Sequence, residues 1–452
     1  MRIVIVGAGK AGEALIENLS KEDHDIVVID QNSNLVEKLV DSYDIIGTVG
    51  NGAAYDVQMN AGVKGADMII AVTNADEVNI LCCILAKRLG VEYTIARVRN
   101  PEYSTQMEFM RDEIGINMII NPEFEAANDM FRMLQFPVAA NIETFAKGRV
   151  NLVEIRVSQE SDLRGLPLME LHKRKGLHIL VCAVVRDEEL FIPRGDFVIQ
   201  AEDRLFVTGT TEQVMKMIKH QGLSKKRMKD VLMIGGGRIS YYLAQKLIKH
   251  HINVKIIELD KERCKELSKK LPEATIINSD GTLQDVLDEE RISYFDACVS
   301  LTGIDEENII VSMHAASKGV SKTITKISRR NLLAILEKVG LESCVIPKDI
   351  MATRIVRYVR AKQNSQGSNV ETLYRILENR VEALEFNVCS NFSQLGVTLE
   401  EMPIKDNILI AYILRGNELI YPRGMDTIQE KDRVIVVTTQ KYLRDLNDIL
   451  EG

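Results

Sequence analysis

Short apolar runs alternate with helical patterns along the first 135 residues of the chain. The first run, Arg2–Val6, is rich in β-branched residues and suits a buried parallel strand. Further strand-like runs lie at 26–29, 44–48, 68–73, 93–98 and 116–120, and helical patterns cover 11–19, 33–41, 53–61, 75–89 and 123–135. This βα alternation predicts a doubly wound parallel sheet.

From residue 149 the pattern changes to strands with little helix. Strand-like runs cover 150–157, 176–185, 189–192 and 204–208, and a short helical pattern follows at 211–219. We therefore expect a small α+β domain after the parallel sheet.

The whole pattern restarts at Asp230. Gly7 and Gly235 are 228 positions apart, and Pro193-Arg194-Gly195 matches Pro422-Arg423-Gly424 at an offset of 229. Matches held at offsets of 228 to 229 over half a chain indicate a tandem duplication. The predicted fold class is α/β, with two Rossmann-like doubly wound parallel-sheet domains, each followed by a small α+β domain. The expected boundaries are 1–122, 141–225, 229–346 and 371–452.

A glycine-rich turn separates the first strand from the first helix. Gly7 permits a sharp turn, Gly9 lets backbone approach a pyrophosphate, and Gly12 lets the helix pack closely on the strand. The free N–H groups at the helix N-terminus then face the anion. Asp30 lies 18 residues after Gly12, at the end of the second strand, where an acid accepts hydrogen bonds from a ribose diol.

The first candidate site therefore combines the turn with strand ends at the carboxyl edge of the sheet. Gln31 follows Asp30, and a carboxylate without a nearby cation repels a 2′-phosphate, so NAD(H) or an adenine nucleotide is favoured over NADP. Two alternatives stay open: an empty Rossmann-like pocket, and a surface ion pair for Arg97. The predicted contacts are Gly7, Ala8, Gly9, Lys10, Ala11, Asp30, Asn51, Gly52, Thr73, Asn74 and Arg97.

The second candidate site repeats this set with changes. Ser240 replaces the third glycine, which puts close packing of the helix in doubt, and Arg238 beside the turn offers a further phosphate contact. We expect binding here with a different affinity or ligand. The predicted contacts are Gly235, Gly236, Gly237, Arg238, Ile239, Glu258, Thr302, Gly303 and Lys326.

Composition excludes several classes of function. The 452 residues are 46% hydrophobic and 27% charged, with a net charge of −8, so the chain has no general attraction to nucleic acid. No run approaches the length of a membrane span, and the N-terminus lacks a signal-peptide pattern. We expect a cytoplasmic protein whose membrane role depends on a partner. The seven cysteines form no CxxC pair, which favours buried thiols.

Catalytic motifs are also missing from the sequence. The seven histidines match no metal spacing and no nucleophile–base pattern, and neither GxSxG nor GxxxxGK[ST] occurs. An enzyme is therefore disfavoured.

Several segments together resemble a known family. MRIVIVGAGKAGEALIENL, GTVGNGA, AGVKGADMIIAVTNADEVN and ARVRNPEY are similar to the N-terminal half of the TrkA family of Trk potassium-uptake regulatory subunits, and the second half resembles its second copy. The resemblance covers essentially the whole chain. It implies two RCK (KTN) nucleotide-binding domains, each followed by a TrkA-C domain.

The resemblance further implies a regulatory role. Family members would assemble as a homo-oligomeric ring on the inner face of the cell membrane and gate a membrane potassium channel or transporter subunit in response to NAD(H), with ATP or ADP as alternatives. Two other hypotheses stay open: an NAD-dependent oxidoreductase, from the Rossmann halves alone, and a cyclic-dinucleotide receptor acting through the TrkA-C domains.

Overall fold

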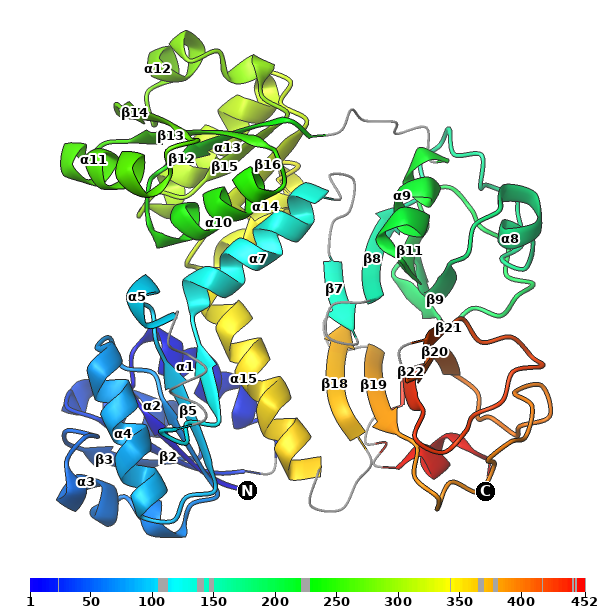
Figure 1. Cartoon of the computed structure of the whole chain (residues 1–452), viewed down its shortest axis with the longest axis horizontal. Helices are drawn as coiled ribbons and strands as arrows, with labels where there is room; N and C mark the ends of the chain where they lie inside the picture. Colours follow the sequence, from blue (N-terminus) through cyan, green and yellow to red (C-terminus); the bar gives the residue numbers. More distant parts are fainter. Residues whose placement is uncertain are drawn as a thin grey trace. The chain divides into compact units, whose positions relative to one another are not determined.

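The computed structural model describes most of the chain. The described residues are 1–22, 24–104, 113–135, 142–145, 150–220, 228–341, 343–364, 370–376, 381–416, 418–440, 443 and 445–451. The chain divides into two units, one formed by residues 1–131 and 228–356 and the other by 132–227 and 357–452. Each unit is built from both halves of the chain, as the sequence colours in Figure 1 show.

Unit 1 contains two parallel sheets. The first has the order β3-β2-β1-β4-β5-β6, with β1 at the centre, where Ile3, Val4 and Ile5 are fully buried. Helices cover its faces, as expected for a run of βα units. Its strands are β1 (Arg2–Val6), β2 (Asp25–Asp30), β3 (Ile46–Val49), β4 (Met68–Ala71), β5 (Tyr93–Arg97) and β6 (Met118–Ile120). Its helices are α1 (Lys10–Leu19), α2 (Ser33–Ser42), α3 (Tyr55–Asn60), α4 (Asp76–Arg88) and α5 (Pro101–Ser104).

The second sheet of unit 1 repeats this topology, with the order β14-β13-β12-β15-β16-β17. Its strands are β12 (Asp230–Ile234), β13 (Asn253–Glu258), β14 (Thr275–Asn278), β15 (Ala297–Ser300), β16 (Lys322–Lys326) and β17 (Cys344–Val345). Its helices are α10 (Arg238–Lys249), α11 (Lys261–Lys270), α12 (Gln284–Glu289), α13 (Asp305–Ser317) and α14 (Leu333–Lys338). The two Rossmann-like sheets and the tandem duplication are thereby confirmed. Helices α7 (Pro122–Gln135) and α15 (Pro347–Asn364) follow the two sheets.

Unit 2 contains two five-stranded sheets whose pairings are antiparallel, with the orders β10-β9-β11-β8-β7 and β18-β19-β22-β20-β21. Their strands are β7 (Ile142–Phe145), β8 (Val150–Arg156), β9 (Leu180–Arg186), β10 (Glu189–Phe191), β11 (Arg204–Gly209), β18 (Val370–Ile376), β19 (Val381–Asn387), β20 (Ile408–Arg415), β21 (Glu418–Ile420) and β22 (Arg433–Thr438). Helices α8 (Glu170–Lys175) and α9 (Thr211–Lys219) lie in the first half. This arrangement confirms a small α+β region in each half of the chain.

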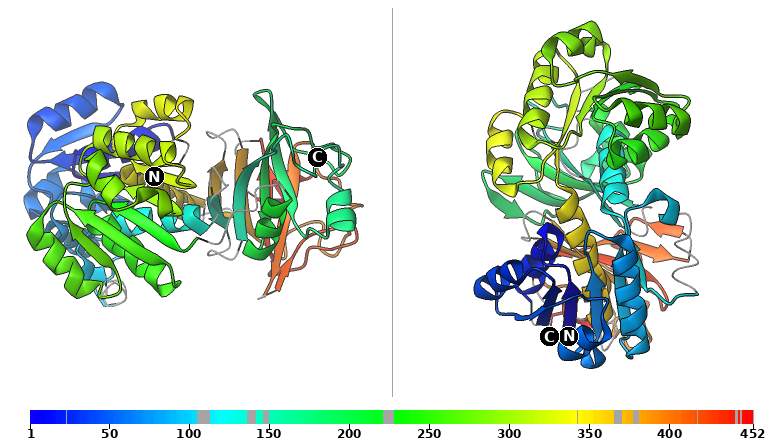
Figure 2. Two further views of the ribbon diagram at one scale, coloured as in Figure 1. Left: turned by 90° about the horizontal axis from the view of Figure 1, so that it is seen from above. Right: turned by 90° about the vertical axis from the view of Figure 1, so that its left-hand side faces the viewer.

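The two antiparallel sheets share a buried core. Side chains of both sheets meet in one cluster that includes Ala183, Phe206 and Ile435, and Figure 2 shows the two sheets side by side. Within this cluster the hydroxyls of Thr208 and Tyr412 are 2.7 Å apart and both residues are buried. This buried hydrogen bond joins the two sheets, and it is stronger in its apolar surroundings than it would be in water.

The expected strand over 176–185 is wrong at its beginning. Residues 170–175 form helix α8, which ends at Gly176 in the left-handed conformation (φ 61°), and β9 starts at Leu180. Basic residues in the last turn followed by glycine are a helix C-terminal signal. The apolar residues around 177–181 obscured this signal in the hydrophobic pattern.

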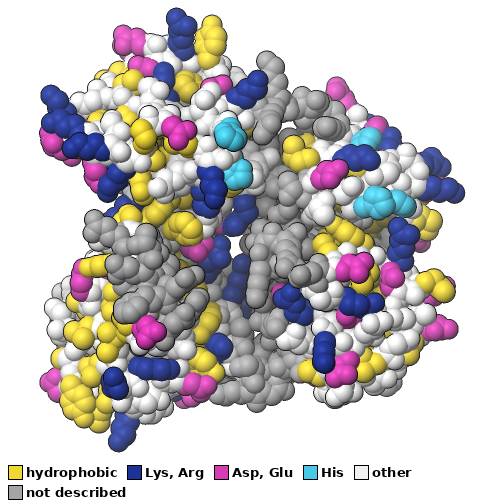
Figure 3. Space-filling model, in the orientation of Figure 1, with side chains coloured by type: hydrophobic (Ala, Val, Ile, Leu, Met, Phe, Trp, Pro, Cys, Tyr) yellow, Lys and Arg dark blue, Asp and Glu magenta, His cyan; other side chains and the backbone are white. Residues whose placement is uncertain are grey.

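The surface of each unit mixes both signs of charge, as the face in Figure 3 shows. Among the described residues, no helix combines the length and the apolar character needed to cross a membrane.

Candidate functional site

The first glycine turn follows β1 and leads into α1. Gly7 has a positive φ of 112°, and a Cβ there would lie 3.0 Å from the backbone nitrogen of Thr73. A Cβ on Gly12 would lie 1.8 Å from the carbonyl oxygen of Gly7, so helix and turn are in close contact. Gly9 has open space beside it, and its φ of −69° suits any residue. The turn thus leaves the N-terminus of α1 accessible to an anion.

Asp30, the acid at the end of β2, forms hydrogen bonds to the backbone on both sides of the site. One carboxylate oxygen of Asp30 accepts the N–H of Ala8 at 2.7 Å, and the other accepts the N–H of Asn32 at 2.9 Å. Each carboxylate oxygen has a further lone pair for a ribose hydroxyl. Asp30 therefore lies beside the turn at the position where an acid contacts a nucleotide ribose.

A buried asparagine positions the neighbouring strand ends. Asn79 is fully buried on α4; its Oδ1 accepts the N–H of Thr73 at 2.8 Å, and its Nδ2 donates to the carbonyl oxygen of Arg97 at 2.9 Å. Asn308 makes the same contacts with Thr302 and Lys326 at 2.8 and 3.0 Å. Sequence reasoning missed both asparagines, although they recur at the offset of 229 that relates the two halves.

The second turn has the same form as the first, but a serine takes the place of the glycine where the helix contacts the turn. Gly235 has a φ of 97°, and Glu258 accepts the N–H groups of Gly236 and Asp260, the latter at 2.8 Å. Ser240 is fully buried, and its hydroxyl donates to the carbonyl oxygen of Gly235. The serine thus replaces the direct backbone contact of Gly12 with a side-chain hydrogen bond.

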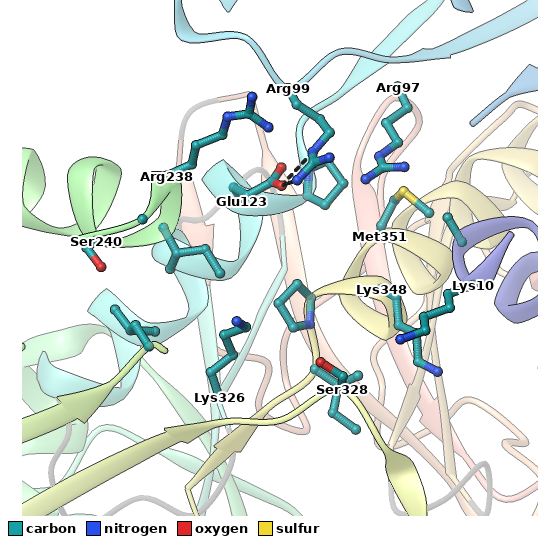
Figure 4. Close-up of a pocket in the computed structure, with 17 residues that line it drawn as sticks. Lys10, Arg97, Arg99, Glu123, Arg238, Ser240, Lys326, Ser328, Lys348 and Met351 are labelled. Atoms are coloured by element: carbon teal, nitrogen blue, oxygen red, sulfur yellow. Dashed lines mark hydrogen bonds and ion pairs between the residues drawn. The ribbon is translucent and has the colours of Figure 1, made fainter. Parts of the chain in front are cut away.

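One cavity of about 530 Å³ within unit 1 lies at the N-termini of α1 and α10, the helices that follow the two glycine turns. Lys10 and Ala11 of α1 line it together with the residues that begin α10, Arg238, Ile239 and Ser240. Figure 4 shows cationic side chains entering the cavity from several elements of both Rossmann-like halves. Its charged lining consists of Lys10, Arg97, Arg99, Arg238, Lys326, Lys348 and Glu123.

This lining is strongly cationic. Glu123, the acid among the lining residues, is paired with Arg99, whose Nε lies 2.6 Å from the carboxylate. Burial lowers the pKa of Arg97, and the neighbouring Arg99 lowers it further. Burial also lowers the pKa of Lys326, whose Nζ donates to the carbonyl oxygen of Thr302 at 2.7 Å. Cations held together in a partly desolvated cavity are stabilised by an anion.

Arg97 has unused hydrogen-bonding capacity. Its buried Nε has no hydrogen-bond partner among the described residues, and Nη1 makes long contacts of 3.4 and 3.5 Å to the carbonyl oxygens of Val72 and Thr73. Such an unsatisfied donor beside a cavity suits a phosphate oxygen. The surface ion pair considered from the sequence is not among the contacts of Arg97 in the described part of the chain.

The predicted site residues divide into two groups. Lys10, Ala11, Arg97, Gly237, Arg238, Ile239 and Lys326 line the cavity. The other thirteen are not among its lining residues: Gly7, Ala8, Gly9, Asp30, Asn51, Gly52, Thr73, Asn74, Gly235, Gly236, Glu258, Thr302 and Gly303. Asn51 and Gly52 follow β3 instead: Asn51 accepts the N–H of Ala53 at 3.0 Å, and a Cβ on Gly52 would meet Val6 at 2.2 Å. Arg99, Glu123 and Lys348 were not predicted, because their place in the cavity depends on how the two halves of unit 1 meet. Within the described residues, no group of three or more His, Cys, Asp or Glu is arranged to hold a metal ion.

Fold and site together define a protein with two tandem pairs of a nucleotide-type Rossmann domain and a small α+β domain. The family model of the TrkA-N domain matches residues 3–122 and 231–347, and that of the TrkA-C domain matches 152–222 and 390–451. The chain belongs to the TrkA family of Trk-system potassium uptake proteins. The names of its TrkA relatives describe Trk-system potassium uptake and state no enzyme activity.

Individual relatives match over nearly the full chain. The Trk system potassium uptake protein TrkA homolog 1 of Methanosarcina mazei is 32% identical over 444 residues, covering 96% of this chain and 97% of the relative. The TrkA homolog of Archaeoglobus fulgidus is 31% identical over 449 residues, covering 99% and 100%. The GsuK channel bound to NAD is similar in structure, with a TM-score of 0.64 at 17% identity over 97% of this chain and 77% of that chain. That likeness shows the fold.

Proposed function

We propose that this protein is a nucleotide-sensing regulatory subunit that gates a Trk-type membrane potassium channel or transporter in response to NAD(H) or an adenine nucleotide. The observation that carries the proposal is the cavity at the N-termini of α1 and α10, beside the two glycine turns, with six lysine and arginine side chains and one paired acid in its lining. Kinship with potassium uptake proteins and the fold shared with the NAD-bound GsuK channel support the same assignment.

The ligand would bind the first turn along the path that a dinucleotide takes in Rossmann folds. Its ribose would hydrogen-bond to Asp30, and its pyrophosphate would lie along the turn from Gly7 to Ala11. The N–H groups of Gly7 and Ala8 already donate to Ile29 and Asp30, so the pyrophosphate would contact those of Gly9 to Ala11. Its phosphate charge would be balanced by Lys10 and Arg97 at the cavity. At the second turn, a ligand would contact the equivalent residues, namely Gly235 to Ile239, Glu258 and Lys326. This ligand can be a different nucleotide from the one bound at the first turn.

Gating requires the ligand to prefer one arrangement of the assembly over another. Each tenfold preference is worth about 1.4 kcal/mol, and several sites in one assembly add their effects. In the cavity, cations from both halves of unit 1 face a common space, so like charges repel until an anion enters. Nucleotide binding would therefore change how closely the two halves approach, and this movement would be transmitted to the membrane partner.

We further propose that the protein acts as a homo-oligomeric ring at the inner face of the cell membrane. Support comes from exposed apolar side chains on equivalent helices: Leu81 on α4 is 50% exposed, and Ile310 and Met313 on α13 are 55% and 46% exposed. An apolar helix surface of this kind is typical of a protein interface. Replacing Ile310 by glutamate should lower the molar mass measured by light scattering, and replacing the half-buried Glu307 on the same helix by glutamine should not. An unchanged mass for both variants would contradict this interface.

The decisive functional experiment is reconstitution with a potassium-transporting membrane subunit. Potassium flux is measured with NADH, NAD, ATP or ADP, using the wild type and the Gly9→Asp variant. The added carboxylate enters open space beside the turn and repels phosphate, so we expect nucleotide-dependent flux in the wild type and a loss of that dependence in the variant. Flux that is independent of every nucleotide would contradict the proposal.

A further inference from the structure

The helices that follow the two nucleotide acids differ at one position beside the turn. Asn32 caps α2 by accepting the N–H groups of Asn34 and Leu35, and Asp260 caps α11 by accepting those of Glu262 and Arg263. Leu35 and Arg263 thus occupy the same place, three residues after the cap. The first half has a hydrocarbon side chain there, and the second half has a guanidinium.

Arg263 contacts the backbone of the second turn. Its Nε donates to the carbonyl oxygen of Gly236 at 2.7 Å, and its Nη2 makes a longer contact of 3.4 Å to the carbonyl oxygen of Gly237. Its Nη1 pairs with Glu266 one turn further along α11, and the side chain is 25% exposed. Lys270 holds Glu266 from the other side at 2.8 Å. The guanidinium is therefore fixed over the turn by hydrogen bonds to charged and neutral oxygens.

The space beside Gly236 is also filled by α11. A Cβ at Gly236 would lie 2.5 Å from a methyl group of Leu267 and 3.0 Å from a carboxylate oxygen of Glu258. The first turn has Ala8 at this position, where a Cβ is accommodated. Ala8 is itself buried, so the space beside this position is filled in both halves, by the alanine Cβ in the first and by Leu267 in the second. The second turn is distinguished by the guanidinium of Arg263, which contacts the backbone beside the path of a ribose and its phosphate.

We propose that Arg263 determines the difference in nucleotide affinity between the two turns, by occupying the strip of the second turn that a ribose and its phosphate would cover. A ligand must break the contacts of the guanidinium with Gly236 and Gly237 before it can bind there. Leu35 in the first half has no hydrogen-bond donor in its side chain, so no equivalent contact has to be broken there and the first turn fills first. This inference rests on the proposed function, because it assigns a regulatory residue to one of the two proposed sites.

The test exchanges the two residues. NADH binding is measured by calorimetry on the full chain in two backgrounds: Gly9→Asp blocks the first turn, and Gly237→Asp blocks the second. Both glycines have open space for a side chain, and their φ values are −69° and −66°. Arg263→Leu is added to the first background and Leu35→Arg to the second.

We expect Arg263→Leu to tighten NADH binding at the second turn at least about tenfold, the factor corresponding to one charge-assisted hydrogen bond that no longer has to be broken. Leu35→Arg should weaken binding at the first turn by a similar factor. Lys265→Leu, which removes an exposed cation from the same helix, should leave both affinities unchanged. Leu35, which occupies the place of Arg263 in the first half, shows that leucine at position 263 suits the fold.

Three results would overturn the inference. The first is equal NADH affinity at the two turns of the wild type, with no effect of Arg263→Leu. The second is weaker binding in Arg263→Leu. The third is tighter binding of NADPH than of NADH at the second turn that is lost in Arg263→Leu, which would make Arg263 a receptor for a 2′-phosphate. No binding of NADH, NAD, ATP or ADP to any form would refute the proposed function, and this inference with it.

Discussion

Replacing Gly12 by alanine tests whether the close contact between α1 and the first turn stabilises the fold. The added Cβ would lie 1.8 Å from the carbonyl oxygen of Gly7, so helix and turn must separate by more than about 1 Å to reach an ordinary contact. Overpacking of this kind costs about 1–3 kcal/mol or more, and alanine returns up to about 1 kcal/mol through its higher helix propensity. We expect a net loss of about 1–2 kcal/mol or more.

The assay is thermal unfolding of the full chain without nucleotide, followed by NADH titration. A loss of 1 kcal/mol lowers the midpoint by about 2–4 °C in a domain of this size class, so Gly12→Ala should unfold several degrees below the wild type. Gly9→Ala is the matched control in the same turn, because its Cβ meets no atom within 4 Å. NADH affinity should fall in Gly12→Ala, since the displaced N–H groups no longer point at the pyrophosphate. Equal midpoints for the two variants would refute the reasoning.

Two further predictions concern buried polar groups. Burial lowers the pKa of Lys326 below 10.5, so this side chain loses its charge at a lower pH than an ordinary lysine does. Nucleotide affinity should therefore fall as the pH rises through the pKa of Lys326. The Lys326→Arg variant should show a flatter dependence of affinity on pH, because arginine stays charged. A profile that keeps its slope in Lys326→Arg would assign the titration to another group. Tyr412→Phe leaves the buried hydroxyl of Thr208 without its 2.7 Å partner and should cost about 1–3 kcal/mol, whereas Tyr421→Phe, at a less buried site, should cost less. Thermal midpoints that rank the two variants in the opposite order would contradict a structural role for the Thr208–Tyr412 contact.

The order of elements and the duplication followed from local pattern. The β-branched run before Gly7, the turn itself and the acid at Asp30 lie within 30 residues, so short-range periodicity and spacing were enough to predict a strand, a turn and a second strand. The repeat offset then extended the prediction to Gly235 and Glu258. Helix α8 was not predicted from the sequence, because its basic last turn directly precedes an apolar run that is typical of a strand.

The cavity could not be predicted in the same way. Its lining depends on how two Rossmann-like halves meet, and residues more than 200 positions apart, such as Arg99 and Lys326, enter it together. Periodicity gives the face of an element but not its neighbour across an interface. The contact of Arg263 with the second turn could not be predicted either, because it joins residues 26 and 27 positions apart. In the sequence, Arg263 is only a cation in the polar first turn of a helix.

The central claim is that the first glycine turn binds a nucleotide, and its most direct test is NADH titration of the purified full chain, with Gly9→Asp as the comparison. Saturable binding to the wild type should be accompanied by stabilisation, about 2.7 kcal/mol at a ligand concentration 100 times the dissociation constant. The high-affinity phase should disappear in Gly9→Asp while the unfolding midpoint of the ligand-free variant stays close to that of the wild type. No stabilisation by NADH, NAD, ATP or ADP, or high-affinity binding that persists in Gly9→Asp, would contradict the claim.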